Sequence, residues 1–200
     1  MERFLNLSAV AVPLDLANVD TDQIIPARFL GDARADQVAA LFHDLRHDAA
    51  GRRRPDFVLN LPAYAAAKIM VSDRNFGCGS SRESAVTTLL DNGYQVFIAP
   101  SFGDIFFNNC LQNGVLPVRL PPARVDALRV QLRARPGAQM SVDLPGQTVT
   151  GPDGQADAFE IDPFRKDCLL RGVDEVSLTL GYEADIARFE IAHRRDHDWL

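Results

Sequence analysis

The sequence contains few cysteines, and they lack the spacing of a ligand set or a disulfide framework. The three cysteines, Cys78, Cys110 and Cys168, are odd in number and far apart along the chain. This pattern favours reduced thiols, and no Cys-x-x-Cys pair brings cluster ligands together. We therefore expect this chain to bind no metal ion and no iron-sulfur cluster of its own.

Long apolar runs and a basic face are also missing. No window approaches the roughly 18 apolar residues that a membrane-spanning helix needs, and the first residues lack a signal-peptide pattern. The formal net charge is -6, and Arg52 to Arg54 form the one dense basic run. Because nucleic-acid binders usually carry a basic face, we expect a cytoplasmic protein without nucleic-acid or membrane partners.

The length and composition fit one globular domain. The chain has 200 residues, of which 46% are hydrophobic and 24% charged, which is ordinary for a soluble protein with a real core. We expect a single domain over residues 1–200. A charged, alanine-rich stretch at about 27–55 is predicted to form a flap, and residues from about 174 to 200 a helical tail.

Apolar runs and helical patterns alternate in the middle of the chain. The expected strands are residues 69–72, 95–99 and 115–120, and the expected helices are 81–91 and 105–111. This alternation predicts an α/β fold with parallel strands and right-handed crossovers. Since ligands of such sheets collect beyond the carboxyl ends of the strands, the turns at 75–82 and 100–104 should share one rim.

The second half of the chain adds elements of a different kind. Pro-Pro and Pro-Gly pairs bound an amphipathic helix, and short alternating runs follow it. We expect a helix at 121–133, a hairpin of 139–144 and 147–150, a strand at 158–161, and helices at 162–171 and 183–193.

The segment from Asn75 to Glu83, Asn-Phe-Gly-Cys-Gly-Ser-Ser-Arg-Glu, is the most informative in the chain. It lies where a strand turns into a helix. Gly77 and Gly79 permit positive φ or close approach to a ligand, and the free N-H groups of the helix start point into the same space. Arg82 adds a planar fork suited to a carboxylate. The residues predict a carboxylate-binding site.

Two other interpretations of the same residues stay open. Ser80-x-x-Glu83 also fits a capping box, in which both side chains bind free backbone N-H groups. The two interpretations are compatible, since one serine can cap while the other faces a ligand and Glu83 holds the turn. Phosphate binding is less favoured, because the glycine spacing matches neither of the nucleotide-binding motifs Gly-x-x-x-x-Gly-Lys-Ser/Thr and Gly-x-Gly-x-x-Gly.

Five motifs, in order along nearly the whole chain, resemble the family of 3-isopropylmalate dehydratase small subunits, within the aconitase superfamily. They are residues 18–26, 55–60, 75–83, 98–106 and 116–118. The resemblance implies an α/β fold of the aconitase type: a swivelling β/β/α domain with a partly parallel central sheet and flanking helices.

The resemblance also implies an activity. Family members are lyases, specifically hydro-lyases, that exchange 2- and 3-isopropylmalate by dehydration and rehydration in leucine biosynthesis. They act only with a large subunit, as a heterodimer or larger assembly. The [4Fe-4S] cluster is expected on that large subunit, and the small dicarboxylate substrate would bind between the subunits.

Site residues follow from the Gly-Ser-Ser-Arg motif of the family. The resemblance implies that Ser80 is the catalytic base. The implied substrate-binding residues are Gly79, Ser81, Arg82, Phe29 and Leu30, and the implied residues that support the site or the partner contact are Thr21, Asp22 and Glu83. Asp22 resembles a residue that pairs with an active-site group of the large subunit.

Two departures from the family leave the substrate open. Ser84 stands where the family usually has histidine, and residues 27–36 replace a lysine and a Thr-Gly-rich loop. Phe29 and Leu30 in this loop suit an apolar substituent. The alternatives are a related small subunit acting on citraconate, maleate or dimethylmaleate, and an anion-binding module without catalysis.

Overall fold

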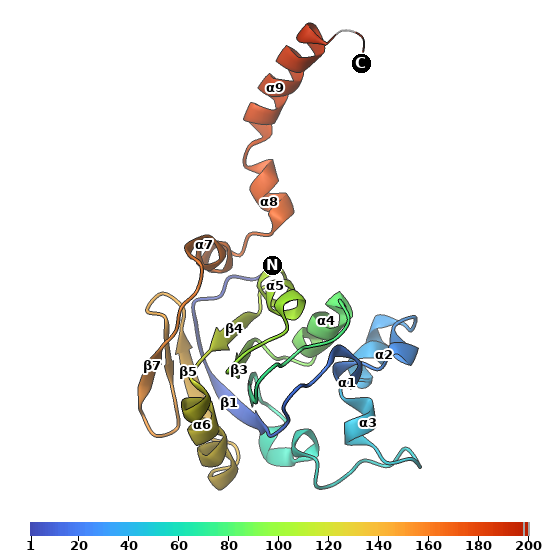
Figure 1. Ribbon diagram of the computed structural model, residues 1–200, viewed down its shortest axis with the longest axis vertical. Helices are drawn as coiled ribbons and strands as arrows, with labels where there is room; N and C mark the ends of the chain where they lie inside the picture. The colour runs from blue at the N-terminus through green and yellow to red at the C-terminus, as the bar shows by residue number, and fades with distance from the viewer. Residues whose placement is uncertain (198, 200) are drawn as a thin grey trace.

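A seven-stranded sheet runs through the molecule, in the order β4-β3-β2-β1-β5-β6-β7. The computed structural model describes residues 1–197 and 199 (Figure 1). The strands are β1 (Asn6–Leu14), β2 (Ile69–Ser72), β3 (Val96–Ala99), β4 (Leu116–Arg119), β5 (Gln139–Asp143), β6 (Thr148–Thr150) and β7 (Ala156–Ala158). The half from β1 to β4 is parallel and the half from β1 to β7 is antiparallel, so the sheet is partly parallel, as predicted.

Most helices lie around this sheet, and the last two extend away from it (Figure 1). The α-helices are α1 (Thr21–Ile24), α2 (Arg34–Ala39), α3 (His43–Arg46), α4 (Glu83–Asp91), α5 (Asp104–Gln112), α6 (Pro122–Ala134), α7 (Pro163–Arg171), α8 (Glu175–Leu180) and α9 (Glu183–Asp196). Short 3-10 helices are η1 (Ala27–Phe29), η2 (Val58–Asn60) and η3 (Pro62–Tyr64). Among the described residues, no helix combines the length and apolar character needed to cross a bilayer.

The strand β1 joins the two halves of the sheet, and it was not predicted from the sequence. Its second half, Ala11 to Leu14, pairs in parallel with β2, while its first half, Asn6 to Val10, pairs antiparallel with β5. In the first half only Ala9 is buried, whereas the second half is continuously buried. Because burial changes within one strand, neither a period of two nor an unbroken apolar run marks its full length.

Strands β2 to β4 are paired in parallel, with a helix between successive strands, as predicted. The strand β2 has the predicted bounds, and α4 begins at Glu83, two residues later than expected. The last strand was placed wrongly: β7 is Ala156–Ala158, with Ala158 paired to Thr148. Phe159 then leaves the sheet and packs into the core, which explains its apolar signal.

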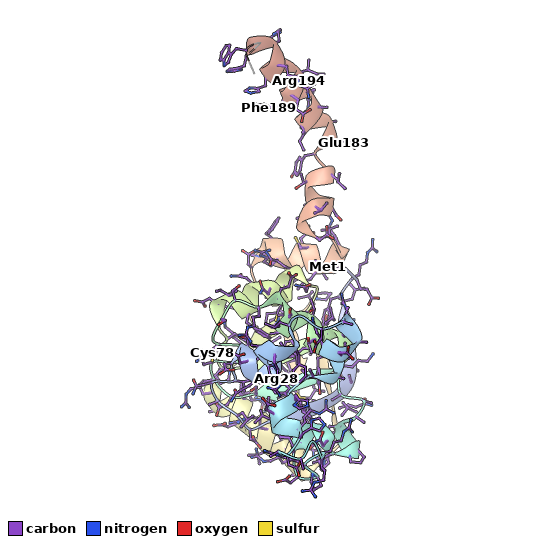
Figure 2. All side chains as sticks on the ribbon, turned by 90° about the vertical axis from the view of Figure 1, so that its right-hand side faces the viewer. Met1, Arg28, Cys78, Glu183, Phe189 and Arg194 are labelled. Atoms are coloured by element: carbon purple, nitrogen blue, oxygen red, sulfur yellow. The ribbon has the colours of Figure 1, made fainter. Side chains whose placement is uncertain are left out.

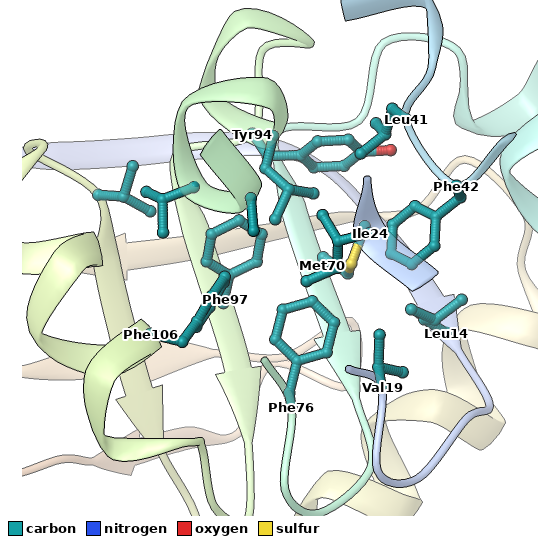
Figure 3. Packing of buried hydrophobic residues seen from close by; sticks show 14 of the residues in the cluster. Leu14, Val19, Ile24, Leu41, Phe42, Met70, Phe76, Tyr94, Phe97 and Phe106 are labelled. Carbon is teal, nitrogen blue, oxygen red and sulfur yellow. The ribbon is translucent and has the colours of Figure 1, made fainter. Parts of the chain in front are cut away.

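Two hydrophobic clusters cover the two faces of the sheet. Along β2, Met70 belongs to one cluster and its neighbours Ile69 and Val71 to the other. The first cluster contains the phenylalanines Phe76, Phe97 and Phe106 (Figure 3). Since both faces of β2 are buried, its carboxyl end is a rigid platform for the turn that follows.

The segment at residues 27–55, predicted to form a flap, is anchored at its centre. Leu41 and Phe42 are fully buried in the first cluster, and the Phe42 N-H donates to Ile24 O at 2.8 Å. An ion pair of 2.7 Å joins Arg34 to Asp91 on α4. The segment is therefore fixed against α4, whereas residues 51–56 are exposed.

The C-terminal arm, residues 174–197, extends away from the sheet. The helices α8 and α9 continue beyond α7 and lie clear of the strands (Figures 1 and 2). Every residue of α9 except His193 is exposed, and the side chain of His193 is half-buried among its neighbours. The helix α9 therefore does not take part in the packed layers of the body.

Candidate functional site

Three chain segments meet beyond the carboxyl ends of β1, β2 and β3. Isolated parallel bridges join Asp20 to Cys78 and Phe76 to Phe102. The Phe76 N-H donates to Ser101 O at 3.1 Å, and the Gly103 N-H donates to Phe76 O at 2.9 Å. The predicted common rim of the two turns is confirmed, and the segment after β1 forms its third side.

Gly77 fixes the start of the site turn, which we define as residues 75–83. Its φ is +72°, and a Cβ at this position would lie 2.1 Å from the Phe106 ring. The Gly77 N-H donates to Val19 O at 2.7 Å. Phe106 is itself held edge-on against Phe76, with ring centroids 5.3 Å apart. The core therefore presses directly on the turn, and only glycine fits there.

Thr21 holds the middle of the site turn. Its buried hydroxyl donates to Ser80 O at 3.0 Å, and its N-H donates to Cys78 O at 2.9 Å. Thr21 begins α1, and Asp20 and Gln23 cap the N-terminus of this helix with a reciprocal capping box. This cap was not predicted, although Asp-x-x-Gln before an apolar pair is its signal.

The serine hydroxyls of the site turn face solvent. Ser80 and Ser81 are exposed, and no hydrogen bond from either hydroxyl is found within the described part of the chain. The capping box proposed for Ser80 and Glu83 is wrong: Arg82 is the N-cap of α4, without a side-chain cap. Thr21 holds the Ser80 carbonyl outside the helix, and the Glu83 carboxylate accepts from Asn113 Nδ2 at 3.3 Å instead.

Arg82 is held by two hydrogen bonds to the carboxylate of Asp22. Its Nη1 and Nη2 donate to the two Asp22 carboxylate oxygens at 2.5 and 2.9 Å, and Nη1 also donates to Ile25 O at 3.4 Å. The Arg82 side chain is 15% exposed and that of Asp22 54%. The hydrogen bonds from Arg82 hold the pKa of Asp22 below its usual range. Asp22 thus pairs within this chain.

One edge of the Arg82 guanidinium remains available to bind a ligand. The contacts to Asp22 use the end of the guanidinium, and no bond from Nε is found among the described residues. The edge formed by Nε and Nη2 matches the two oxygens of a carboxylate. Backbone N-H groups of residues 79–83, at the start of α4, likewise donate no hydrogen bond within the described structure. Such unpaired donors attract negative charge.

The thiol of Cys78 lies in the same turn but is not activated. Burial, and then the nearby Asp20 carboxylate, raise its pKa, so the thiol is protonated at neutral pH. Cys110 and Cys168 are buried elsewhere. In the described parts of the chain, no three His, Cys, Asp or Glu side chains converge as a metal-ligand set. The side chains of the described residues therefore do not offer the donor set that a cluster needs.

Phe29 and Leu30 follow Asp22 in the sequence, and their side chains pack partly against the first hydrophobic cluster. The Ala27 N-H donates to Asp22 Oδ1 at 3.2 Å, which ties η1 to the site. Both side chains are half-buried against the first cluster. Ser84, the second residue of α4, is also half-buried. The Phe29 ring packs against that of His43, with ring centroids 5.0 Å apart.

Comparison with known proteins identifies the family. The model of the aconitase C-terminal domain matches residues 1–123, and the model described as LeuD_N matches residues 126–163. The chain is 50% identical to a protein of Paramagnetospirillum magneticum over 201 residues, which cover 100% of both chains. A protein of Parvibaculum lavamentivorans shows the same identity and coverage. Both are named 3-isopropylmalate dehydratase small subunit. The chain belongs to this family of small subunits.

A solved structure supports the fold of the small subunit. The 3-isopropylmalate dehydratase chain of Methanocaldococcus jannaschii superposes with a TM-score of 0.66, covering 92% of this chain and 99% of that chain. Its sequence identity is 21%, so this likeness bears on the fold alone. It confirms the predicted aconitase-type α/β architecture.

Proposed function

We propose that this chain is the small subunit of a 3-isopropylmalate dehydratase, a hydro-lyase that interconverts 2- and 3-isopropylmalate in leucine biosynthesis. The observation that carries the proposal is the site turn itself. It presents two exposed hydroxyls, a clamped guanidinium and a row of free N-H groups on one rigid rim. Relatives that are 46–50% identical over the full chain bear the name of this enzyme.

Ser80 acts as the base in this proposal. Its Oγ takes the proton from the substrate carbon next to a carboxylate. A serine hydroxyl is far too weak an acid to ionise in water at neutral pH, so its alkoxide needs stabilisation. The N-H groups of residues 79–83, the positive end of α4 and the nearby guanidinium of Arg82 supply it, as in an oxyanion hole.

Arg82 and Ser81 bind the substrate carboxylate. The fork edge of Nε and Nη2 receives its two oxygens, and Gly79 lets the backbone approach because it has no side chain. Asp22 is the positioning residue, since its two hydrogen bonds fix the plane of the guanidinium. Thr21 is the positioning residue for Ser80, because its hydroxyl donates to the Ser80 carbonyl oxygen.

The other half of the chemistry belongs to the large subunit. An iron of a [4Fe-4S] cluster on that subunit would act as Lewis acid toward the departing hydroxyl. This chain contributes the base, the carboxylate clamp and the exclusion of water from one side. Its open rim is consistent with a half-site that a partner completes.

Reconstitution tests the proposal directly. The chain and the large subunit of a relative are purified without oxygen, mixed, and assayed with 2-isopropylmalate, citraconate, maleate and dimethylmaleate. We expect the highest kcat/KM with 2-isopropylmalate. Faster turnover of another acid would reassign the substrate, and inactivity of a correctly assembled pair on all four would refute the enzyme proposal.

A further inference from the structure

The helix α9 carries an exposed apolar stripe that nothing in the body covers. Tyr182, Ile186, Phe189 and His193 recur at spacings of four and three, which puts them on one side of the helix. Tyr182 is 63% exposed and Phe189 67%. The ring of Phe189 stacks on that of His193, with centroids 5.5 Å apart. The stripe is a continuous apolar and aromatic surface.

The arm lies apart from the site turn. Figure 2 labels Cys78 on the body, and Glu183, Phe189 and Arg194 on the extended arm. The arm also lies outside both matched family models, which end at residues 123 and 163. A stripe of this kind on a helix without packing neighbours is a mark of an interaction surface, because an isolated helix of about 14 residues is marginal in water.

Carboxylates border the stripe on both sides. Glu183 and Glu190 each follow a stripe residue, and Asp185 precedes Ile186. Arg188 pairs with Asp185, and Arg194 with Glu190 at 3.7 Å, but these pairs are exposed and therefore weak. Around the helix, Glu183, Asp185 and Glu190 lie nearest the stripe, and Arg188 and Arg194 lie farther from it.

These borders disfavour pairing of α9 with a second copy of itself. In an antiparallel pair along the stripe, Glu183 would lie beside Glu190 of the second copy. In a parallel pair, Asp185 would lie beside Glu190 of the second copy. Both arrangements bring like charges together. The complementary surface is an apolar groove with basic borders on a different protein.

We propose that α9 is a docking helix that inserts Tyr182, Ile186 and Phe189 into an apolar, basic-rimmed groove of the large subunit. This inference rests on the proposed function, which supplies the partner. The site turn would then perform the chemistry, while the arm secures the association from outside the reaction centre.

The test compares two substitutions in the same helix. Phe189→Ala removes the centre of the stripe, whereas Ile191→Ala removes a side chain that is 72% exposed on the opposite side of α9. Alanine preserves helix propensity in both variants. The measurement is the affinity of each full-length chain for the large subunit, with the sedimentation of the chain alone.

We expect Phe189→Ala to weaken pairing by about 10- to 100-fold, the effect of losing an aromatic anchor, and Ile191→Ala to pair like the wild-type chain. High large-subunit concentration should restore the activity lost in Phe189→Ala. Equal affinity of both variants would overturn the docking role, even if the wild-type pair is active. A wild-type dimer that Phe189→Ala converts to monomer would assign the stripe to self-association. A wild-type chain that neither pairs nor shows activity would instead refute the proposed function.

Discussion

The site turn and the C-terminal arm are built in opposite ways. The turn is short and polar, yet it is held by Val19, Thr21, Asp22 and Phe106, which come from other parts of the chain. The arm is long and partly apolar, yet the side chains of its last helix are almost all exposed. The site turn is rigid because a reaction needs accurately placed atoms. The arm is exposed, as a surface that binds another molecule must be. Substitutions in the two regions should therefore change different quantities.

The largest effect is expected from Ser80→Ala. Loss of the base should lower kcat by about 10²- to 10⁴-fold, while the unfolding midpoint and pairing with the large subunit stay unchanged because the hydroxyl is exposed. Steady-state kinetics of the reconstituted pair measures this. Cys78→Ala in the same turn is the control, with a far smaller loss, since its thiol is protonated. Near-normal turnover of Ser80→Ala would remove the base assignment.

Gly77→Ala should damage the turn through the core. The added Cβ would meet the Phe106 ring at a backbone conformation that alanine rarely adopts, which costs about 2 to 4 kcal/mol of unfolding free energy. Gly154→Ala shares the positive φ but has open space around it, so it isolates the backbone strain. Denaturant unfolding of both variants gives the comparison, and equal losses would show that the Phe106 contact is unimportant.

Asp22→Asn should leave Arg82 charged but loosely positioned. We expect KM to rise by about tenfold, as for the loss of one charge-assisted hydrogen bond, with a smaller change in kcat. Asp91→Asn, which breaks an ion pair outside the site, should not alter KM. If both variants behave alike in the assay, positioning by Asp22 is unsupported.

The Asp22 interaction also has a defined pH range. Because Arg82 lowers the pKa of Asp22 below its ordinary value of 3.8 in the folded chain, the pair stabilises the fold at every pH above that ordinary value. This stabilisation disappears as pH falls through the lowered pKa. The unfolding midpoints of the wild-type chain and Asp22→Asn should differ at neutral pH and converge only in strong acid.

Removing the outer part of the arm, with α9, should have the smallest effect on stability. Deletion of residues 182–200 leaves the contact of the Met1 amino group with Asp174 and the whole sheet intact. The thermal midpoint of the body should change by no more than about 2 °C, since little buried surface is lost. Calorimetry of the two chains measures the difference. A large drop would mean that α9 supports the body and is not a separate, exposed element.

Sequence patterns predicted the regular parts of this fold and missed its long-range parts. The strand β2 and the helix α5 have strong apolar patterns, and both were predicted. The capping box at Ser80 was wrong because a contact from Thr21, 59 positions away, decides the conformation there. The pairing of Asp22 with Arg82 is equally non-local. No local propensity contains such information, so the motif indicated the chemistry while the structure revealed what positions it.

The strand β1 has a consequence for how the chain folds. Residues Ala11–Leu14 pair with β2 and residues Asn6–Val10 pair with β5, and β5 begins only at Gln139. Until both neighbours are in place, one half of the β1 backbone lacks its hydrogen-bond partners. The parallel and antiparallel halves should therefore melt as one cooperative unit, with the amides of β1 among the last to exchange with solvent.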